Sequence, residues 1–156
     1  MAIKYLNRSN IPTVLAGTQK AIFGYGNNAG YFSITNLVSN TGVVATDTAG
    51  VGTARPALAA AGYGTDKAIF GYGYVTLSMT NLVSDTGVVA GDTTGVGTAR
   101  STLGAAGYGT DKAIFGYGGT PSVLSMTNLV SNTGVVGNDV TGVGTARQRP
   151  AAAAYG

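Results

Sequence analysis

The sequence contains no cysteine, no histidine, no tryptophan and no glutamate among its 156 residues. Without cysteine it can form neither a disulfide nor a thiolate metal site. Without histidine it lacks the commonest metal ligand and general base. The repeated serines at 33, 78 and 125 therefore have no imidazole to activate them, and a Ser–Lys dyad would require lysines that lie in solvated turns. We predict that the protein is not an enzyme.

Charge is also scarce, because charged residues make up 10% of the chain, against about 25% in ordinary soluble domains. The net charge of +3 comes from scattered lysines and arginines, whereas nucleic-acid binding proteins cluster them on one face. No apolar run approaches the length of a membrane span or a signal-peptide core. We expect no nucleic-acid partner, no membrane partner and, by default, cytoplasmic synthesis.

The acidic residues offer little chemistry, although all six are aspartates. Calcium needs six to eight oxygen ligands, and a Thr-Asp pair in a hairpin supplies too few. Glycoside hydrolysis needs two carboxylates in one cleft, whereas a repeat array spreads equivalent acids one per repeat. We predict no metal and no cofactor, and we interpret Asp66 and Asp111 as turn residues.

Glycine is abundant, at 26 residues, and it belongs to a long internal repeat. The heptapeptide KAIFGYG occurs at 20–26, 67–73 and 112–118, so successive copies are 47 and 45 residues apart. The same register aligns an arginine, a TNLVS segment, a TGVV segment and a GVGTAR segment in each repeat. A glycine in almost every ten-residue window would cost a helix about 1 kcal/mol each. The repeat is therefore expected to form strands.

Each repeat is predicted to contain four strands separated by tight turns. Gly64 and Asp66 tolerate the positive φ that a hairpin turn requires. The small residues of the first strand and the bulkier ones of the second suit a wedge-shaped sheet. In the second repeat the expected strands are Leu58–Tyr63, Lys67–Tyr72, Leu77–Val83 and Gly87–Ala90.

The run R-x-x-L-x-A-A-G-Y-G-T-D-K-A-I-F-G-Y-G at 100–118, followed by S-M-T-N-L at 125–129, resembles a kelch repeat. In that family an arginine precedes the first strand, a glycine pair closes the second, and four antiparallel strands form each propeller blade. Here GYG replaces the usual glycine pair, and Val88-Val89 stands where the fourth strand usually has tryptophan. The chromosome-condensation-regulator type of propeller remains an alternative. The resemblance implies an all-β, β-propeller-type array of three four-stranded kelch-like blades plus one surplus C-terminal strand.

The repeat register also divides the chain. The first strand of the first blade, Arg8–Gly17, is degenerate and contains Pro12, whereas the C-terminal RQRPAAAAYG aligns with the first strand of a fourth repeat. The predicted units are an N-terminal extension (1–7), three blades (8–54, 55–99 and 100–146) and the surplus strand (147–156).

Three blades are too few for a ring, since propellers have about four to eight. Two copies would supply six blades in a homo-oligomer of about 31 kDa, twice the 15.5 kDa of one chain. Residues 147–156 would then complete or replace the Arg8–Gly17 strand of the next copy. Alternatively, the open arc docks on a larger scaffold.

The recurring side chains suggest where partners could bind. Tyr25, Tyr72 and Tyr117 are candidate contacts for a ligand or partner, such as a stacked sugar, or else they fill the space between blades. The aspartates at 47, 92 and 139 are expected to cap the chain or pair with the repeated arginines. The asparagines at 36, 81 and 128 either bond a neighbouring loop, which we favour, or line a channel. Phe23, Phe70 and Phe115 are predicted to face neighbouring blades.

The run GYGTDKAIFGYG is also similar to kelch-like arrays in proteins of tailed phages and environmental sequences. That resemblance implies a virion component, such as a decoration or fibre-associated protein, with itself or other virion proteins as partners. The predicted function is thus a non-enzymatic structural or assembly module. The alternative is a glycan-binding propeller lectin, followed by a hydrolase or isomerase propeller.

Overall fold

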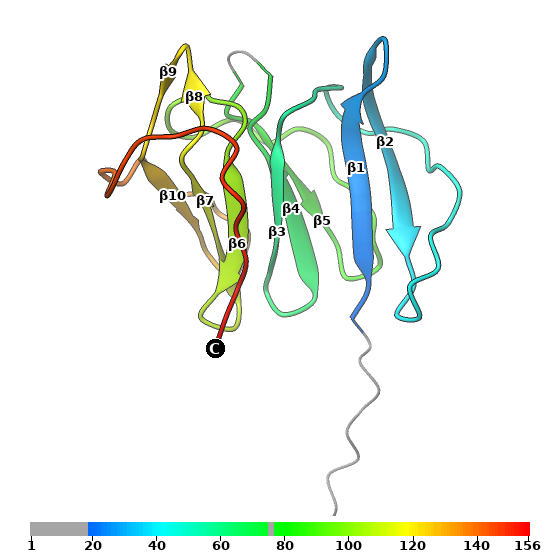
Figure 1. Ribbon diagram of the computed structural model, residues 1–156. Coiled ribbons are helices and arrows are strands. Elements are labelled where there is room, and N and C mark those ends of the chain that lie inside the picture. The colour runs from blue at the N-terminus through cyan, green and yellow to red at the C-terminus, as the bar shows by residue number, and fades with distance from the viewer. Residues whose placement is uncertain (1–18, 75–76) are drawn as a thin grey trace, which may run out of the picture.

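The computed structural model describes residues 19–74 and 77–156, and in that part of the chain it is all-β, with no helix (Figure 1). The expectation of an all-β fold is therefore confirmed. Each repeat forms one small antiparallel sheet, and the three sheets lie side by side in chain order. Since no helix is present in these residues, none can cross a membrane.

The first sheet pairs β1 (Ala21–Asn27) with β2 (Tyr31–Val38). In the second sheet β4 (Lys67–Gly71) lies between β3 (Ala59–Tyr63) and β5 (Thr80–Val83). In the third sheet β7 (Lys112–Gly116) lies between β6 (Gly104–Tyr108) and β10 (Thr127–Val130). A short ribbon of β8 (Gly119–Thr120) and β9 (Ser122–Val123) projects from the third repeat.

The sheets have two or three strands, so the prediction of four-stranded blades is wrong for the described residues. The segment expected as the fourth strand of the second repeat, Gly87–Ala90, forms one isolated bridge with β5, Val83↔Val89, and the next bridge, Thr80↔Thr93, lies beyond that segment. Between these bridges the side chain of Asn81 donates to the carbonyl of Ala90 at 3.1 Å. A side-chain amide thus takes the place of a backbone donor, and the ladder is interrupted.

The C-terminal segment, residues 147–156, is not a β-strand, which corrects the prediction of a surplus strand. It runs beside β6 (Figure 1), and a Cβ added at Gly104 would lie 3.1 Å from the carbonyl oxygen of Pro150. Among the described residues no second strand pairs with this segment, so it makes no ladder. The degenerate segment Arg8–Gly17 lies outside the described residues.

The turn between β3 and β4 differs in one detail from the prediction. Gly64 and Thr65 have the positive φ values, 58° and 69°, whereas Asp66 does not. Asp66 instead forms an ion pair with Lys67 at 2.9 Å on the surface. Lys112 pairs with Asp111 in the same way, so these two lysines are paired within their own turns.

The second and third sheets pack closely because their first strands, β3 and β6, are built largely from alanine and glycine. A Cβ added at Gly107 of β6 would lie 3.4 Å from the carbonyl oxygen of Gly62 in β3. The bulk between the sheets comes from the second strands, and Phe115 of β7 lies directly over Gly71 of β4. The main core therefore lies between the second and third sheets and contains Tyr63, Ile69, Tyr72, Leu103, Ala113, Phe115 and Val130.

Candidate functional site

The three tyrosines of the GYG segments all lie at or near a boundary between repeats, with φ of 63° to 64°. Tyr72 is fully buried. Its ring lies 5.2 Å from the ring of Phe115, and its hydroxyl donates to the carbonyl of Val96 at 3.2 Å. Tyr25 and Tyr117 are half-buried. In the intact array Tyr72 therefore offers no ring face to a ligand.

A buried arginine lies at each of the two boundaries between the described repeats. The guanidinium carbon of Arg55 lies 4.7 Å from the ring centroid of Tyr25 in the preceding repeat, within the range of a cation–π contact. Its Nε donates to the carbonyl of Tyr72 at 2.7 Å and its Nη2 donates to Oδ1 of Asn81 at 2.7 Å. The Arg55 side chain is 1% exposed.

Asp92 completes this group by binding both sides of the boundary. Its carboxylate lies 3.7 Å from Nη1 of Arg55 and accepts from Nδ2 of Asn81 at 2.9 Å. It also accepts from the backbone N–H and the hydroxyl of Thr53, at 3.0 and 2.7 Å. We call Thr53, Arg55, Asn81 and Asp92 the Arg55 network.

The next boundary repeats this geometry with Thr98, Arg100, Asn128 and Asp139, the Arg100 network. Arg100 lies 4.4 Å from the ring centroid of Tyr72 and donates to Asn128 at 2.7 Å. Asp139 lies 3.9 Å from Nη1 of Arg100 and accepts 2.7 Å from the hydroxyl of Thr98.

Burying a cation is costly unless its donors are satisfied. In both networks the arginine meets carbonyl, amide and carboxylate oxygens. Within the described residues no buried side-chain nitrogen or oxygen lacks a hydrogen-bond partner. Each buried polar side-chain atom of the two networks therefore has a partner, while Asp92 and Asp139 remain partly exposed, at 29% and 30%.

The titration of these groups follows from the same contacts. Burial acts to raise the pKa of Asp92, but hydrogen bonds from Thr53 and Asn81 and the charge of Arg55 hold that pKa below its usual value. The pKa of Asp139 is lowered in the same way by hydrogen bonds from Thr98 and Asn128 and by the charge of Arg100. Burial lowers the pKa of Arg55 and raises the pKa of Tyr72.

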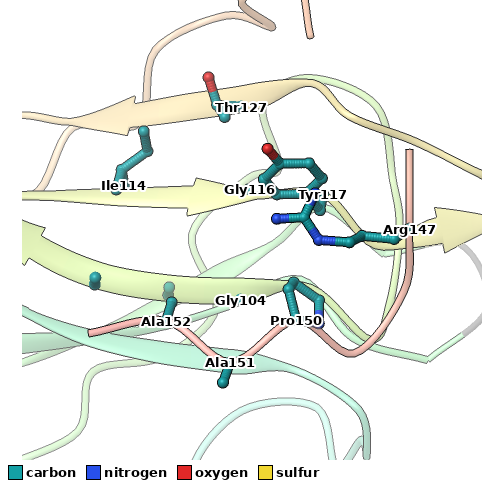
Figure 2. A pocket seen from close by; sticks show the side chains of 11 residues that line it. Gly104, Ile114, Gly116, Tyr117, Thr127, Arg147, Pro150, Ala151 and Ala152 are labelled. Atoms are coloured by element: carbon teal, nitrogen blue, oxygen red, sulfur yellow. The ribbon is translucent and has the colours of Figure 1, made fainter. Parts of the chain in front are cut away.

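The third arginine, Arg147, is exposed. Its guanidinium carbon lies 3.9 Å from the ring centroid of Tyr117, and it donates to the carbonyl of Thr145 at 3.1 Å. Its side chain contacts no asparagine or aspartate of the described residues. Beside it lies an apolar hollow of about 140 Å³ lined by Gly116, Tyr117, Arg147, Pro150 and others (Figure 2).

At the opposite end of the array, Asn36 and Asp47 occupy the positions of Asn81 and Asp92. The Asn36 amide donates to Oδ1 of Asp47 at 2.7 Å and to the carbonyl of Ala45 at 3.1 Å. The matching arginine of the same chain, Arg8, lies outside the described residues.

Several predicted contacts are therefore present in the structure. Asp92 and Asp139 pair with the repeated arginines. Asn81 and Asn128 hydrogen-bond the following loop, as favoured from the sequence. The sequence did not indicate that each arginine would stack on the tyrosine of the preceding repeat, because that contact depends on how the sheets pack.

An exposed aromatic pair was also missed. The rings of Tyr31 and Tyr74 have centroids 4.9 Å apart, and these residues are 48% and 47% exposed. Tyr31 begins β2 and Tyr74 lies in the loop after β4, so the pair spans two repeats. Both residues lie outside the repeated heptapeptide, in the loop regions that vary, and only the fold could bring them together.

No group of three or more acidic residues that could hold a metal occurs in the described part of the chain. Neither a protein-family model nor a curated protein sequence matches this chain. The site is therefore interpreted from its own geometry.

Proposed function

We propose that the protein is a non-enzymatic structural or assembly module, in which each repeat packs against the next. The observation that supports this proposal is the hydrogen bonding of the buried arginines in the Arg55 and Arg100 networks, whose charged groups join one repeat to the next. Catalytic groups are usually left with unused bonding capacity and perturbed pKa values in a cleft. Here the conspicuous charged groups serve the boundaries between repeats.

The kelch-like, propeller-type organisation belongs to the same proposal. The second and third repeats each have a small-residue first strand and a bulkier second strand, which favours wedge-shaped units. The similarity of GYGTDKAIFGYG to tailed-phage arrays adds a proposed location, the virion, where the protein would be a decoration or fibre-associated component that binds itself or other virion proteins.

The proposed virion location is tested on virus particles isolated from the source of the gene. Density-purified particles are analysed by mass spectrometry and labelled with antibodies raised against this chain. Peptides from all three repeats and label at a fixed position on the particle are the expected result. Absence of the chain from every particle fraction, with the chain present in the soluble fraction, would reject the virion role.

The absence of catalysis is tested separately. Purified protein is expected to show no turnover on panels of ester, phosphate and glycoside substrates. Activity that follows the protein peak through two successive columns, and that is lost from a Arg100→Ala preparation, would contradict the non-enzymatic proposal.

Glycan binding is the second candidate, and the exposed pair of Tyr31 and Tyr74 favours it. Tyrosine rings on a surface are suitable platforms for the apolar faces of sugars. A glycan array should then give saturable binding that Tyr31→Ala and Tyr74→Ala abolish while the fold is retained. Tyr108→Ala, at another exposed tyrosine, is the matched control. A blank array rejects this candidate.

A further inference from the structure

We propose that a second copy of this chain docks head to tail, with Phe23 of its first repeat filling the hollow beside Gly116 and Tyr117. This inference rests on the proposed assembly function and specifies its partner. We call the surface of the hollow the C-terminal face, and the surface of β1 and β2 that carries Phe23 the N-terminal face.

The two internal boundaries supply the template for this contact. Phe70 lies over Gly24, where an added Cβ would be 2.9 Å from its ring, and its ring centroid is 5.1 Å from that of Tyr25. Phe115 lies over Gly71 in the same way and is 5.2 Å from Tyr72. A phenylalanine of one repeat thus enters a socket formed by glycine and tyrosine of the repeat before it.

The third socket and the first phenylalanine have no such partner in the described residues. Gly116 and Tyr117 hold the socket positions, and the space above them is the hollow of about 140 Å³ (Figure 2). A Cβ added at Gly116 would approach only Thr127, at 3.2 Å, and no aromatic ring. Phe23 is 63% exposed. The array therefore has an open socket at one end, formed by Gly116 and Tyr117, and an exposed phenylalanine at the other. We call the exposed Phe23 side chain the knob.

Charge complementarity points to the same pairing. Arg147 already stacks on Tyr117, as Arg100 stacks on Tyr72. In the complete networks the arginine reaches an asparagine and an aspartate of the repeat that it begins. Asn36 and Asp47 of a second copy would supply that pair, already joined at 2.7 Å.

The sequence that precedes each arginine distinguishes a second copy from the chain's own N-terminal segment. In the complete networks the aspartate accepts bonds from a threonine two residues before the arginine, as Thr53 bonds Asp92. Thr145 holds that position before Arg147. The matching position before Arg8 is Leu6, which has no hydroxyl. The GVGTAR segment at 142–147 therefore fits Asp47 better than the chain's own N-terminal segment does.

The start of the C-terminal segment has the backbone conformation that precedes the first strands of the second and third repeats. Arg149 has φ of 54°, like its counterparts Ala57 at 58° and Thr102 at 55°. Its N–H donates to the carbonyl of Thr102 at 2.7 Å, and the N–H of Thr102 donates to the carbonyl of Ala57 at 2.8 Å. In the intact repeats this strand pairs with the KAIFG strand that follows it.

The partner strand is available on the N-terminal face. β4 pairs with β3 and β5, and β7 pairs with β6 and β10, whereas β1 pairs only with β2 among the described strands. Addition of residues 150–156 to the other edge of β1 would give the first repeat the same three-strand order. Such strand addition is a common mode of peptide recognition. The contact is heterologous, so it produces a ring or a filament according to whether the rotation closes.

The experiment uses two variants that each damage one face. Phe23→Asp removes the knob, and Gly116→Leu fills the socket at a position whose φ is not positive. Masses are measured by light scattering over a range of concentrations, and circular dichroism checks that each variant is folded. The wild-type chain is expected to form species of 31 kDa or larger, multiples of 15.5 kDa. Each variant alone should associate at least about 30-fold more weakly, as for the loss of an interface hot spot.

Mixing the two variants is the decisive measurement. The Phe23→Asp chain keeps an intact socket and the Gly116→Leu chain keeps an intact knob, so an equimolar mixture should form a heterodimer. Val88→Asp, at a residue that is 66% exposed in the middle repeat, is the matched control and should assemble like the wild type. Arg147→Ala should weaken association by roughly 30-fold or more, because Asp47 would lose its cation at the interface.

A wild-type chain that stays at 15.5 kDa at all concentrations overturns the inference. Assembly that is unchanged by both variants overturns it too, and so does a mixture that remains monomeric while the wild type assembles. These outcomes leave the proposed virion role standing with another partner. Absence from particles rejects that role whatever the oligomeric state, so the two failures are distinguishable.

Discussion

Phe115 and Phe23 occupy the same position of an identical heptapeptide, but Phe115 is fully buried and Phe23 is 63% exposed. The arginines differ in the same way, since Arg100 is fully buried and Arg147 is exposed. In each pair the buried residue has a neighbouring repeat that supplies a socket or an acceptor. The comparison teaches that a repeat of this kind cannot bury its own faces, so stability comes largely from the contacts between neighbours.

The largest expected difference is in the unfolding free energy lost when Phe115 and Phe23 are each replaced by alanine. Phe115→Ala leaves a cavity over Gly71 and Tyr72 and should cost about 3–5 kcal/mol of unfolding free energy. Phe70→Ala belongs in the same range, whereas Phe23→Ala should cost less than about 1 kcal/mol in the monomer, as for exposed positions. Urea unfolding at high dilution measures all three variants. Equal losses at positions 23 and 115 would show that the burial difference has no energetic consequence.

The arginine comparison is expected to give the next largest effect. Arg100→Ala leaves Asn128 and Asp139 without their cation, and since Asp139 is partly solvated we expect a loss of about 2–3 kcal/mol. Arg147→Ala removes only a surface stacking contact and should change the unfolding free energy of the monomer by less than about 0.5 kcal/mol. Denaturant midpoints of the two variants are compared under the same conditions. A greater loss for Arg147→Ala would reverse the assignment of complete and incomplete networks.

The sockets can be compared through their glycines. A Cβ at Gly71 would lie 2.6 Å from the ring of Phe115, whereas at Gly116 the nearest atom would be 3.2 Å away. Gly71→Ala should therefore destabilise the fold by about 1–3 kcal/mol through overpacking, and Gly116→Ala should be nearly neutral. Thermal unfolding followed by circular dichroism distinguishes them. If both substitutions are neutral, the rings are not seated on the glycines as described.

The smallest effect concerns acid. The pKa values of Asp92 and Asp139 are lowered in the folded state, so folding favours their charged forms. Their contribution is fully present above the unfolded pKa of about 3.9 and is lost as the pH falls through the lower folded values. Urea midpoints should therefore fall between about pH 4 and pH 2 more steeply for the wild type than for Asp92→Asn with Asp139→Asn. Identical slopes would show that these carboxylates do not stabilise the boundaries.

Much of the fold could be predicted from the repeated residues. The spacing of KAIFGYG and the frequency of glycine predicted one small sheet per repeat, and the first two strands of the second repeat were placed within a residue of β3 and β4. The fourth strand was wrong, because the run around Val89 has strand-forming residues but Asn81 occupies the carbonyl that the ladder needs. The pattern of single residues does not reveal such competition by a side chain.

The candidate site, too, was predictable from the sequence only in part. The sequence by itself determined which residues recur, and it predicted that the repeated aspartates could pair with the repeated arginines. Only the tertiary structure decided that Arg55 stacks on the tyrosine of the preceding repeat and that Tyr72 is buried. It also decided that Phe23 and Arg147 lie exposed although their sequence copies are covered. The physical reason is that burial depends on the neighbouring sheet, so identical local sequences acquire different surroundings according to their place in the array.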